Sequence, residues 1–190
     1  MILAIVKYGH PALRKKGEHI EHITPEIKKL IADMFETMEE NHGVGLAAQQ
    51  VGVAKQLTVI DIRAATDRPS TLELDGKPAD PAEIMPLVLI NPVITPVGEP
   101  AAGPEGCLSF PEIFADITRP AVVDVQALDG RGKPIAFRCG GLLARAVQHE
   151  KDHLNGVLFI DRMDKKTKLE LQPELDALQA ETKAALQKAK

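Results

Sequence analysis

Two histidines four residues apart, with a glutamate directly after the first, give the sequence its clearest chemical signal. His149, Glu150 and His153 stand in the segment QHEKDHLNG. On a helix, residues four apart lie one turn above each other on the same face, so both imidazoles can bind one cation. Glu150 then stands beside a metal-bound water. This His-Glu-x-x-His spacing is that of metal-dependent hydrolases.

The alternative is a solvated helix that carries two histidines by chance. Leu142 and Ala146 precede the histidines on the same helical face. An apolar stripe beside the imidazoles favours a buried face, because a face exposed to water would be polar throughout. The pattern therefore favours the metal site.

Two imidazoles need at least one further ligand. A downstream glutamate could serve, as in zinc peptidases, and so could a cysteine; the candidates are Glu170, Glu174, Glu181, Cys107 and Cys139. The glutamates fall in a segment that has the pattern of a polar outer helix, and Cys139 has the pattern of packing at a strand end. Gly106 leaves the backbone beside Cys107 open to close approach. A further alternative is a purely structural zinc site. Such a site would be closed by four protein ligands, commonly several cysteines, and this chain has only one well-placed cysteine.

The helix that carries the histidines is predicted from Leu142 to about Asn155, after Gly140 and Gly141 and before Gly156. A second helix is predicted over 24–41, with Thr24 as its cap and Pro25 at its first position. Runs rich in β-branched residues predict strands at 56–62 and 87–94, and a strand pair at 121–129 and 134–139. The segment 44–53 is expected to form a special loop.

The remaining segments are more polar. The stretch 64–86 is rich in Pro, Asp and Gly and is expected to form an exposed loop or a small hairpin. Residues 165–190 favour helix, with Pro173 starting the last segment. We expect an α+β fold in which short, mostly antiparallel strands pack around the central metal-binding helix, flanked by N-terminal and C-terminal helices. The predicted division is a catalytic domain over 1–164 and a C-terminal helical extension over 165–190.

Composition excludes several classes of protein. The chain has 190 residues, a net charge of −4 and 44% hydrophobic residues. The acidic balance argues against a dedicated nucleic-acid site, and no run is apolar and long enough to suggest a membrane span or a signal peptide. Two cysteines fit a reducing compartment. We expect a cytoplasmic protein.

Three segments in order resemble the signatures of the peptide deformylase family. They are GVGLAAQQVG (43–52), EGCLSFPE (105–112) and QHEKDHLNG (148–156), and coarser similarity runs from the N-terminus to about Asp161. The resemblance implies removal of the formyl group from the N-terminal formylmethionine of newly made polypeptides. The stretch 64–86 is longer than expected for the family, and the last helix matches none of its motifs.

The resemblance also implies residue roles. Cys107, His149 and His153 would bind the metal, whose bound hydroxide attacks the formyl carbon, with Glu150 as general acid and base. Gln50 and the backbone N–H of Leu108 would stabilise the oxyanion. Main-chain groups of Val44, Gly45 and Gly106 would bind the extended substrate, and apolar side chains would surround its methionine: Val44, Leu142 and Ala146. Apart from the resemblance, Glu105 and Arg119 flank the Cys107 segment. Either their pairing supports that segment, or they form an ordinary surface pair.

The implied cofactor is one divalent metal ion. Family resemblance favours Fe(II) in the cell, and the same ligands also suit Zn(II), Ni(II) and Co(II). The implied partners are N-formylmethionyl nascent peptides. Contact with the ribosome through Lys165, Lys166, Lys168 and the last helix is one expectation for the C-terminal segment; a solvated helix is the other.

Overall fold

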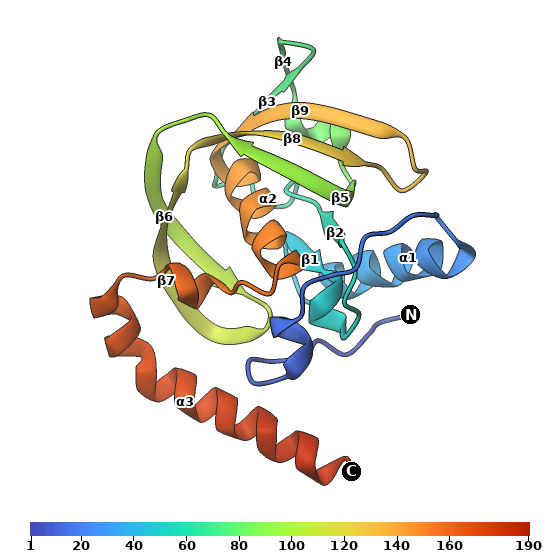
Figure 1. The fold of residues 1–190 in the computed structure, drawn as a ribbon. Helices are drawn as coiled ribbons and strands as arrows, with labels where there is room; N and C mark the ends of the chain where they lie inside the picture. The colour runs from blue at the N-terminus through green and yellow to red at the C-terminus, as the bar shows by residue number, and fades with distance from the viewer.

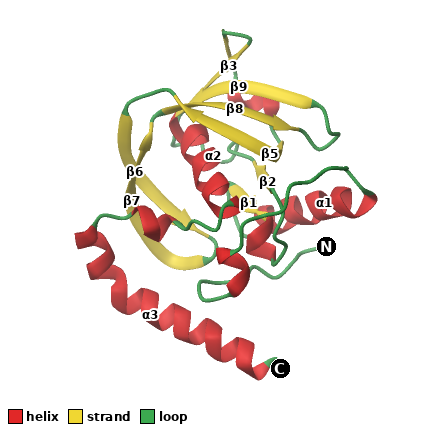
Figure 2. Ribbon diagram, viewed as in Figure 1, coloured by secondary structure: helices red, strands yellow, loops and turns green.

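The helix that carries the two histidines lies at the centre of the molecule. The structure is a computed structural model that describes all residues, 1–190. Helix α2 (Gly141–Leu154) passes between a large curved sheet and a long hairpin, and the other two α-helices lie outside the strands (Figures 1 and 2). This arrangement confirms the predicted α+β fold with a central helix. No helix is both long and apolar enough to cross a membrane.

The main sheet contains seven strands in the order β1-β2-β5-β8-β9-β3-β4, and all neighbouring strands are antiparallel. Its strands are β1 (Gly45–Ala47), β2 (Leu57–Ile60), β3 (Ser70–Leu74), β4 (Lys77–Ala79), β5 (Leu87–Pro96), β8 (Val122–Leu128) and β9 (Pro134–Gly140). The stretch 64–86 thus holds the small hairpin β3–β4. Asp75 and Gly76 form its turn, both with positive φ, and β3 pairs with β9, so this hairpin extends the main sheet.

A separate two-stranded sheet covers the other side of α2. It consists of β6 (Pro100–Cys107) and β7 (Phe110–Pro120), two strands that the sequence pattern did not predict. Prolines and glycines in β6 hid this strand from the sequence pattern. Because β6 pairs with β7 alone, its other edge needs no backbone donors, and Pro100 and Pro104 are tolerated there. Cys107 therefore ends a strand that leads directly toward α2.

The flanking helices are α1 (Pro25–Glu40) and α3 (Lys165–Lys188). The Thr24 side chain caps α1 by accepting a hydrogen bond from Ile27 N, as expected. The prediction that Pro173 starts a helix was wrong, because α3 runs through it without a break. The Leu169 carbonyl, which loses its partner at Pro173, lies on an exposed part of the helix where water can bind it. Short 3-10 helices complete the chain: Pro11–Arg14, Ala48–Val51, Pro81–Ile84 and Phe159–Arg162.

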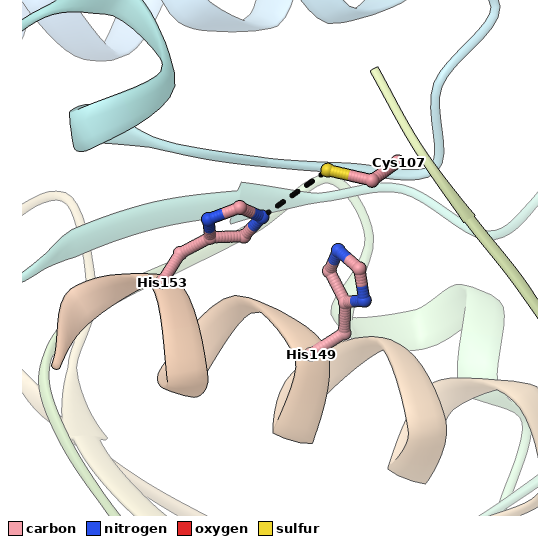
Figure 3. A group of neighbouring side chains, drawn as sticks. All are labelled: Cys107, His149 and His153. Carbon is pink, nitrogen blue, oxygen red and sulfur yellow. Dashed lines mark hydrogen bonds between the residues drawn. The ribbon is translucent and has the colours of Figure 1, made fainter. Parts of the chain in front are cut away.

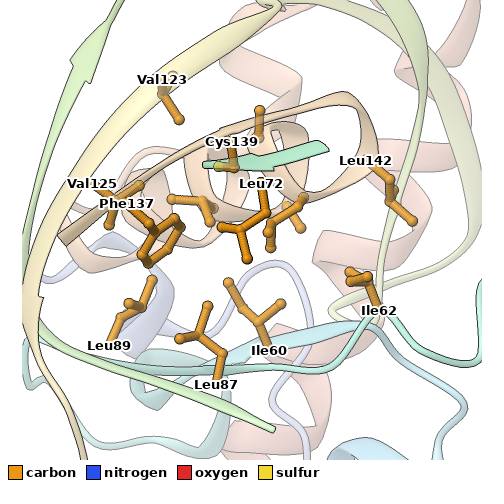
Figure 4. Packing of buried hydrophobic residues seen from close by; sticks show 14 of the residues in the cluster. Ile60, Ile62, Leu72, Leu87, Leu89, Val123, Val125, Phe137, Cys139 and Leu142 are labelled. Carbon is orange, nitrogen blue, oxygen red and sulfur yellow. The ribbon is translucent and has the colours of Figure 1, made fainter. Parts of the chain in front are cut away.

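Three apolar clusters hold these layers together. The largest lies between the main sheet and α2 and includes Leu89, Phe137 and Leu143 (Figure 4). A second packs α1 against β1 and β2. A third joins β7, the 3-10 helix at 159–162 and α3 through Phe110, Phe159 and other residues. The core is aliphatic apart from a few phenylalanines, so α2 is fixed by packing on both sides.

Pro69 and Ser70, at the start of β3, cap the start of α2. The Ser70 hydroxyl accepts a hydrogen bond from Leu143 N at 2.9 Å, and the Pro69 carbonyl accepts one from Leu142 N at 3.0 Å. Gly141 makes this contact possible: its φ is +65°, and a Cβ there would stand 2.3 Å from the Pro69 oxygen. The helix has no capping side chain of its own, so the 64–86 stretch supplies the cap.

Candidate metal centre and its cavity

Cys107, His149 and His153 come together at the end of β6 and on two successive turns of α2. One potential ligand atom from each lies within 4.8 Å of the other two. The Cys107 sulfur is 3.4 Å from His153 Nε2, and both imidazoles point toward the sulfur (Figure 3). The rival ligands are elsewhere: the three downstream glutamates lie on α3, and Cys139 is buried in the core on β9.

The three side chains fit a metal ion in both geometry and charge. Ligand atoms around a tetrahedral metal stand roughly 3.3–3.7 Å apart, so small side-chain adjustments suffice to close this group around one ion. Burial opposes a charge on His149, but its hydrogen bonds with Cys107 and Glu105 raise its pKa well above the usual value. The surroundings therefore favour positive charge at this imidazole, and a metal ion that displaces the proton from its Nε2 atom supplies that charge. Burial keeps His153 neutral by lowering its pKa.

A buried carboxylate orients His149. Glu105 Oε1 accepts a hydrogen bond from His149 Nδ1 at 2.8 Å. Because a carboxylate can only accept, the proton sits on Nδ1 and Nε2 is left to bind a metal. Burial alone would raise the pKa of Glu105, but hydrogen bonds from His149 and Arg119 lower it well below the usual value.

Arg119 forms a bidentate ion pair with this carboxylate, which confirms the predicted pairing of Glu105 and Arg119. Its Nε and Nη2 donate to the two Glu105 oxygens at 2.6 and 2.9 Å, and both side chains are less than 5% exposed. Arg145 donates to Glu105 as well, at 2.9 Å. A buried charge in this position is stable only because several donors satisfy it.

Asp152 extends the network to the far end of α2 and was missed from the sequence. Its carboxylate accepts hydrogen bonds from Arg119 at 2.9 Å and from Arg162 at 2.6 and 2.8 Å. Asp152 follows the His-Glu pair and points away from the metal ligands, so its role is to anchor Arg119. Nothing in the local sequence identifies its partners, which lie 33 and 10 residues away.

Gln50 reaches the cluster from the 3-10 helix at 48–51. Its Oε1 accepts a hydrogen bond from Ala47 N at 2.9 Å, which fixes the orientation of the amide. The Nε2 group then donates to Ser109 Oγ at 3.2 Å and lies 3.5 Å from the Cys107 sulfur. A side chain that caps its own backbone therefore also presents an N–H donor to the cluster.

Glu150 is almost fully buried, at 4% exposed, and its Oε2 atom has no hydrogen-bond partner within the protein. Burial raises its pKa to about 7. The carboxylate lies against the backbone of β1: a Cβ on Gly45 would stand 2.6 Å from Glu150 Oε1. Glycine at this position allows the strand and the carboxylate to approach each other.

A cavity of about 580 Å³ opens beside the cluster. Its walls contain Cys107, His149, Glu150 and Gln50, together with all the other residues expected to bind substrate: Val44, Gly45, Gly106, Leu108, Leu142 and Ala146. The sequence did not identify Phe114 and Arg68, which also line it. Phe114 is 69% exposed, and a Cβ on Gly106 would stand 2.6 Å from its ring.

Comparison with known proteins agrees with this arrangement. The sequence model of the polypeptide deformylase family matches residues 2–169. The chain is 47% identical to a peptide deformylase of Opitutus terrae over 187 residues, which cover 97% of each chain. It is 46% identical to one of Methylacidiphilum infernorum, covering 94% of this chain and 93% of the other. The chain belongs to the peptide deformylase family.

The fold agrees as well. A crystal structure of a Synechococcus elongatus peptide deformylase in complex with actinonin is similar to this structure with a TM-score of 0.76. The two are 40% identical, and the alignment covers 93% of this chain and 85% of the other. Peptide deformylases are metal-dependent hydrolases that remove the formyl group from nascent peptides. As a member of this family, the chain is an enzyme of that kind.

Proposed function

We propose that Cys107, His149 and His153 hold the catalytic metal ion and that deformylation takes place in the 580 Å³ cavity beside them. Support comes from the single cluster of ligand atoms and from the Glu105 hydrogen bond that leaves His149 Nε2 available. A divalent ion bound there supplies a Lewis acid that activates water and polarises a carbonyl oxygen. Three protein ligands leave the open position that catalysis requires.

Glu150 is proposed to move the proton. Its free Oε2 atom faces no competing donor, so the carboxylate can accept a proton from the attacking water and later deliver it to the leaving amine. A pKa raised to about 7 by burial suits both steps, because the group can then gain and lose a proton near neutral pH. This buried carboxylate beside the ligand cluster is the observation that carries the proposed mechanism.

Gln50 and the backbone N–H of Leu108 are proposed to stabilise the oxyanion. The hydrogen bond from Ala47 N fixes the Gln50 amide, so its N–H group is oriented before substrate binds. A donor held in this way needs no reorganisation during reaction and contributes roughly 3–4 kcal/mol of transition-state stabilisation. Leu108 lies in the cavity wall directly after Cys107.

The substrate is proposed to lie extended along the main-chain groups of Val44, Gly45 and Gly106. Its methionine side chain would contact Val44, Leu142 and Ala146, which line the same cavity. Gly45 matters here because any side chain on it would meet the Glu150 carboxylate. The cavity wall is thus apolar where the methionine is proposed to bind.

We assign Fe(II) as the metal in the cell, with Zn(II), Ni(II) or Co(II) able to replace it, because a thiolate and two imidazoles suit all four ions. We also propose that the enzyme acts in the cytoplasm, because its substrates are newly made chains. Contact with the ribosome through the lysines at 165, 166 and 168 remains a prediction. The division of the chain at residue 165 remains one too.

Substrate choice tests the proposal. A formyl carbon carries only hydrogen, whereas an acetyl group places a methyl where a closely packed site has no room. We expect formyl-Ala peptides to be cleaved with a lower kcat/KM than formyl-Met peptides. From formyl-Met to acetyl-Met it should fall by more than the roughly 10–200-fold that one methylene gives in a pocket. Metal analysis of the same preparation gives the occupancy. Comparable kcat/KM for the formyl-Met and acetyl-Met peptides would contradict the assigned geometry.

A further inference from the structure

A second cavity, of about 720 Å³, lies between α3 and the start of β7, next to the N-terminal segment. In Figure 1, α3 runs below β7 and continues below the N-terminal segment. Ile113 and Leu178 give the cavity apolar walls, and Glu174, Ala177 and Glu181 of α3 lie along its exposed side. Nothing in the proposed mechanism uses this groove.

The groove continues from the active-site cavity. Lys7, Pro111 and Glu112 line both. Lys7 Nζ donates to the Leu108 carbonyl at 3.2 Å, so the shared wall is tied to the turn that follows Cys107. Glu112 has a φ of +61°, a left-handed conformation that turns the chain at the start of β7. A peptide that leaves the active site on this side enters the groove directly.

The charge of the groove is negative. Glu112, Glu174 and Glu181 line it, and none of the three makes an ion pair within the protein. Lys7 is the only lysine or arginine in its wall, and its ammonium is engaged with the Leu108 carbonyl. Three carboxylates against one ammonium leave an excess of two negative charges. Lysine and arginine side chains are complementary to this surface.

We propose that this groove binds the downstream part of the substrate peptide and favours basic residues there; the proposal rests on the deformylase function and extends its substrate site. An extended chain advances roughly 3.3 Å per residue, so an octapeptide extends roughly 16 Å farther than a formylated tripeptide. Longer peptides reach past Glu112 to α3. The C-terminal helix thereby becomes one wall of the substrate site.

The test compares three substrates: formyl-Met-Ala-Ser, and two octapeptides that begin identically and end in five residues containing either two lysines or two glutamates. The readout is the ratio of octapeptide to tripeptide kcat/KM. At low salt we expect the lysine octapeptide to exceed the glutamate octapeptide by about five- to tenfold, as two exposed ion pairs allow. The difference should shrink in salt, which screens exposed charges.

Variants assign the effect to the groove. Glu174→Gln combined with Glu181→Gln should remove most of the lysine preference, and Ala177→Trp should lower the ratio for both octapeptides. Glu170→Gln is the matched control, because Glu170 is exposed on the same helix and lies outside the groove. An unchanged lysine preference in the double variant, or unchanged ratios in Ala177→Trp, would overturn the proposal. Failure to cleave the tripeptide would instead contradict the deformylase function itself.

Discussion

Helices α2 and α3 both carry charged and apolar residues, yet the molecule holds them very differently. Ten of the fourteen residues of α2 are buried, whereas α3 buries only Leu175 among its twenty-four residues. The site helix is enclosed by the sheet, the β6–β7 hairpin and the network around Glu105. The outer helix rests on the body of the protein through one narrow apolar stripe.

The comparison indicates which of the two helices must be positioned precisely. Metal ligands must be held to a fraction of an ångström, and the packing of α2 between the main sheet and the β6–β7 hairpin provides that. A helix that only forms one wall of a groove can be positioned less precisely. Changes at the α2 site should therefore alter chemistry by orders of magnitude, and changes on α3 should alter stability or peptide preference while the chemistry continues.

The largest effect is expected for Cys107→Ala. Loss of the sulfur leaves two imidazoles, which should not retain stoichiometric metal, so activity should disappear with the metal. Cys139→Ala is the matched control: its thiol lies in the core on β9, where burial raises its pKa to about 12, and both metal and activity should be nearly intact. Full metal content in a folded Cys107→Ala protein, measured by elemental analysis, would refute the ligand assignment.

The next effect in size is expected for Glu150→Gln. The amide keeps the shape of the side chain but cannot take a proton, so turnover should fall by roughly 10²–10⁴-fold while the metal stays bound. Glu170→Gln on α3 makes the same chemical change in an exposed position and should have no effect on the tripeptide. Substantial turnover by Glu150→Gln at neutral pH would mean that another group moves the proton.

Helix α2 and the spacing of its two histidines could be predicted from the sequence. The four-residue spacing of the histidines depends only on helix geometry, and the bounds of α1 and α2 followed from Thr24, Pro25 and the glycines around 140. The Gly- and Pro-rich β6 could not be recognised as a strand. Its regularity comes from pairing with β7, which local propensity does not report.

Long-range contacts were also beyond the sequence pattern. Asp152, Ser70 and Phe114 look like ordinary residues in their own segments, and each gains its role from partners brought close by the fold. The helix through Pro173 shows the reverse case. A strong local stop signal had little effect there, because the carbonyl that lost its donor is exposed to solvent.

The single buried anchor of α3 gives a stability test. Leu175 is 1% exposed and packs in the cluster that contains Phe110. Leu175→Ala should lower the free energy of unfolding by about 2–4 kcal/mol, with kcat/KM on a formyl-Met tripeptide nearly unchanged. Leu169→Ala, on the same helix but 73% exposed, should change neither. Urea unfolding and the peptide assay check both.

Deletion of all residues after Lys168 is the stronger form of this test. It removes Leu175 together with the groove wall, so stability should fall further while short formylated peptides are still cleaved. A large loss of tripeptide turnover in a truncated protein that remains folded would show that α3 supports the active site. In that case the contrast between the two helices would not hold.

The smallest effect concerns how each helix begins. The cap of α2 is Ser70, 73 residues away in the chain, and the cap of α3 is its own neighbour Asp164, which accepts from Thr167 N at 2.7 Å. Removal of a cap costs about 1 kcal/mol. Ser70→Ala removes the cap of a helix that is packed in the core, so it should lower the global free energy of unfolding by that amount. Asp164→Ala should mainly fray one exposed turn, a local opening that global unfolding does not report.

Urea unfolding combined with hydrogen exchange at the two helix starts distinguishes these outcomes, and Thr66→Ala, at an exposed position, is the control. Equal losses of global stability in the two cap variants would show that α3 is as firmly coupled to the core as α2.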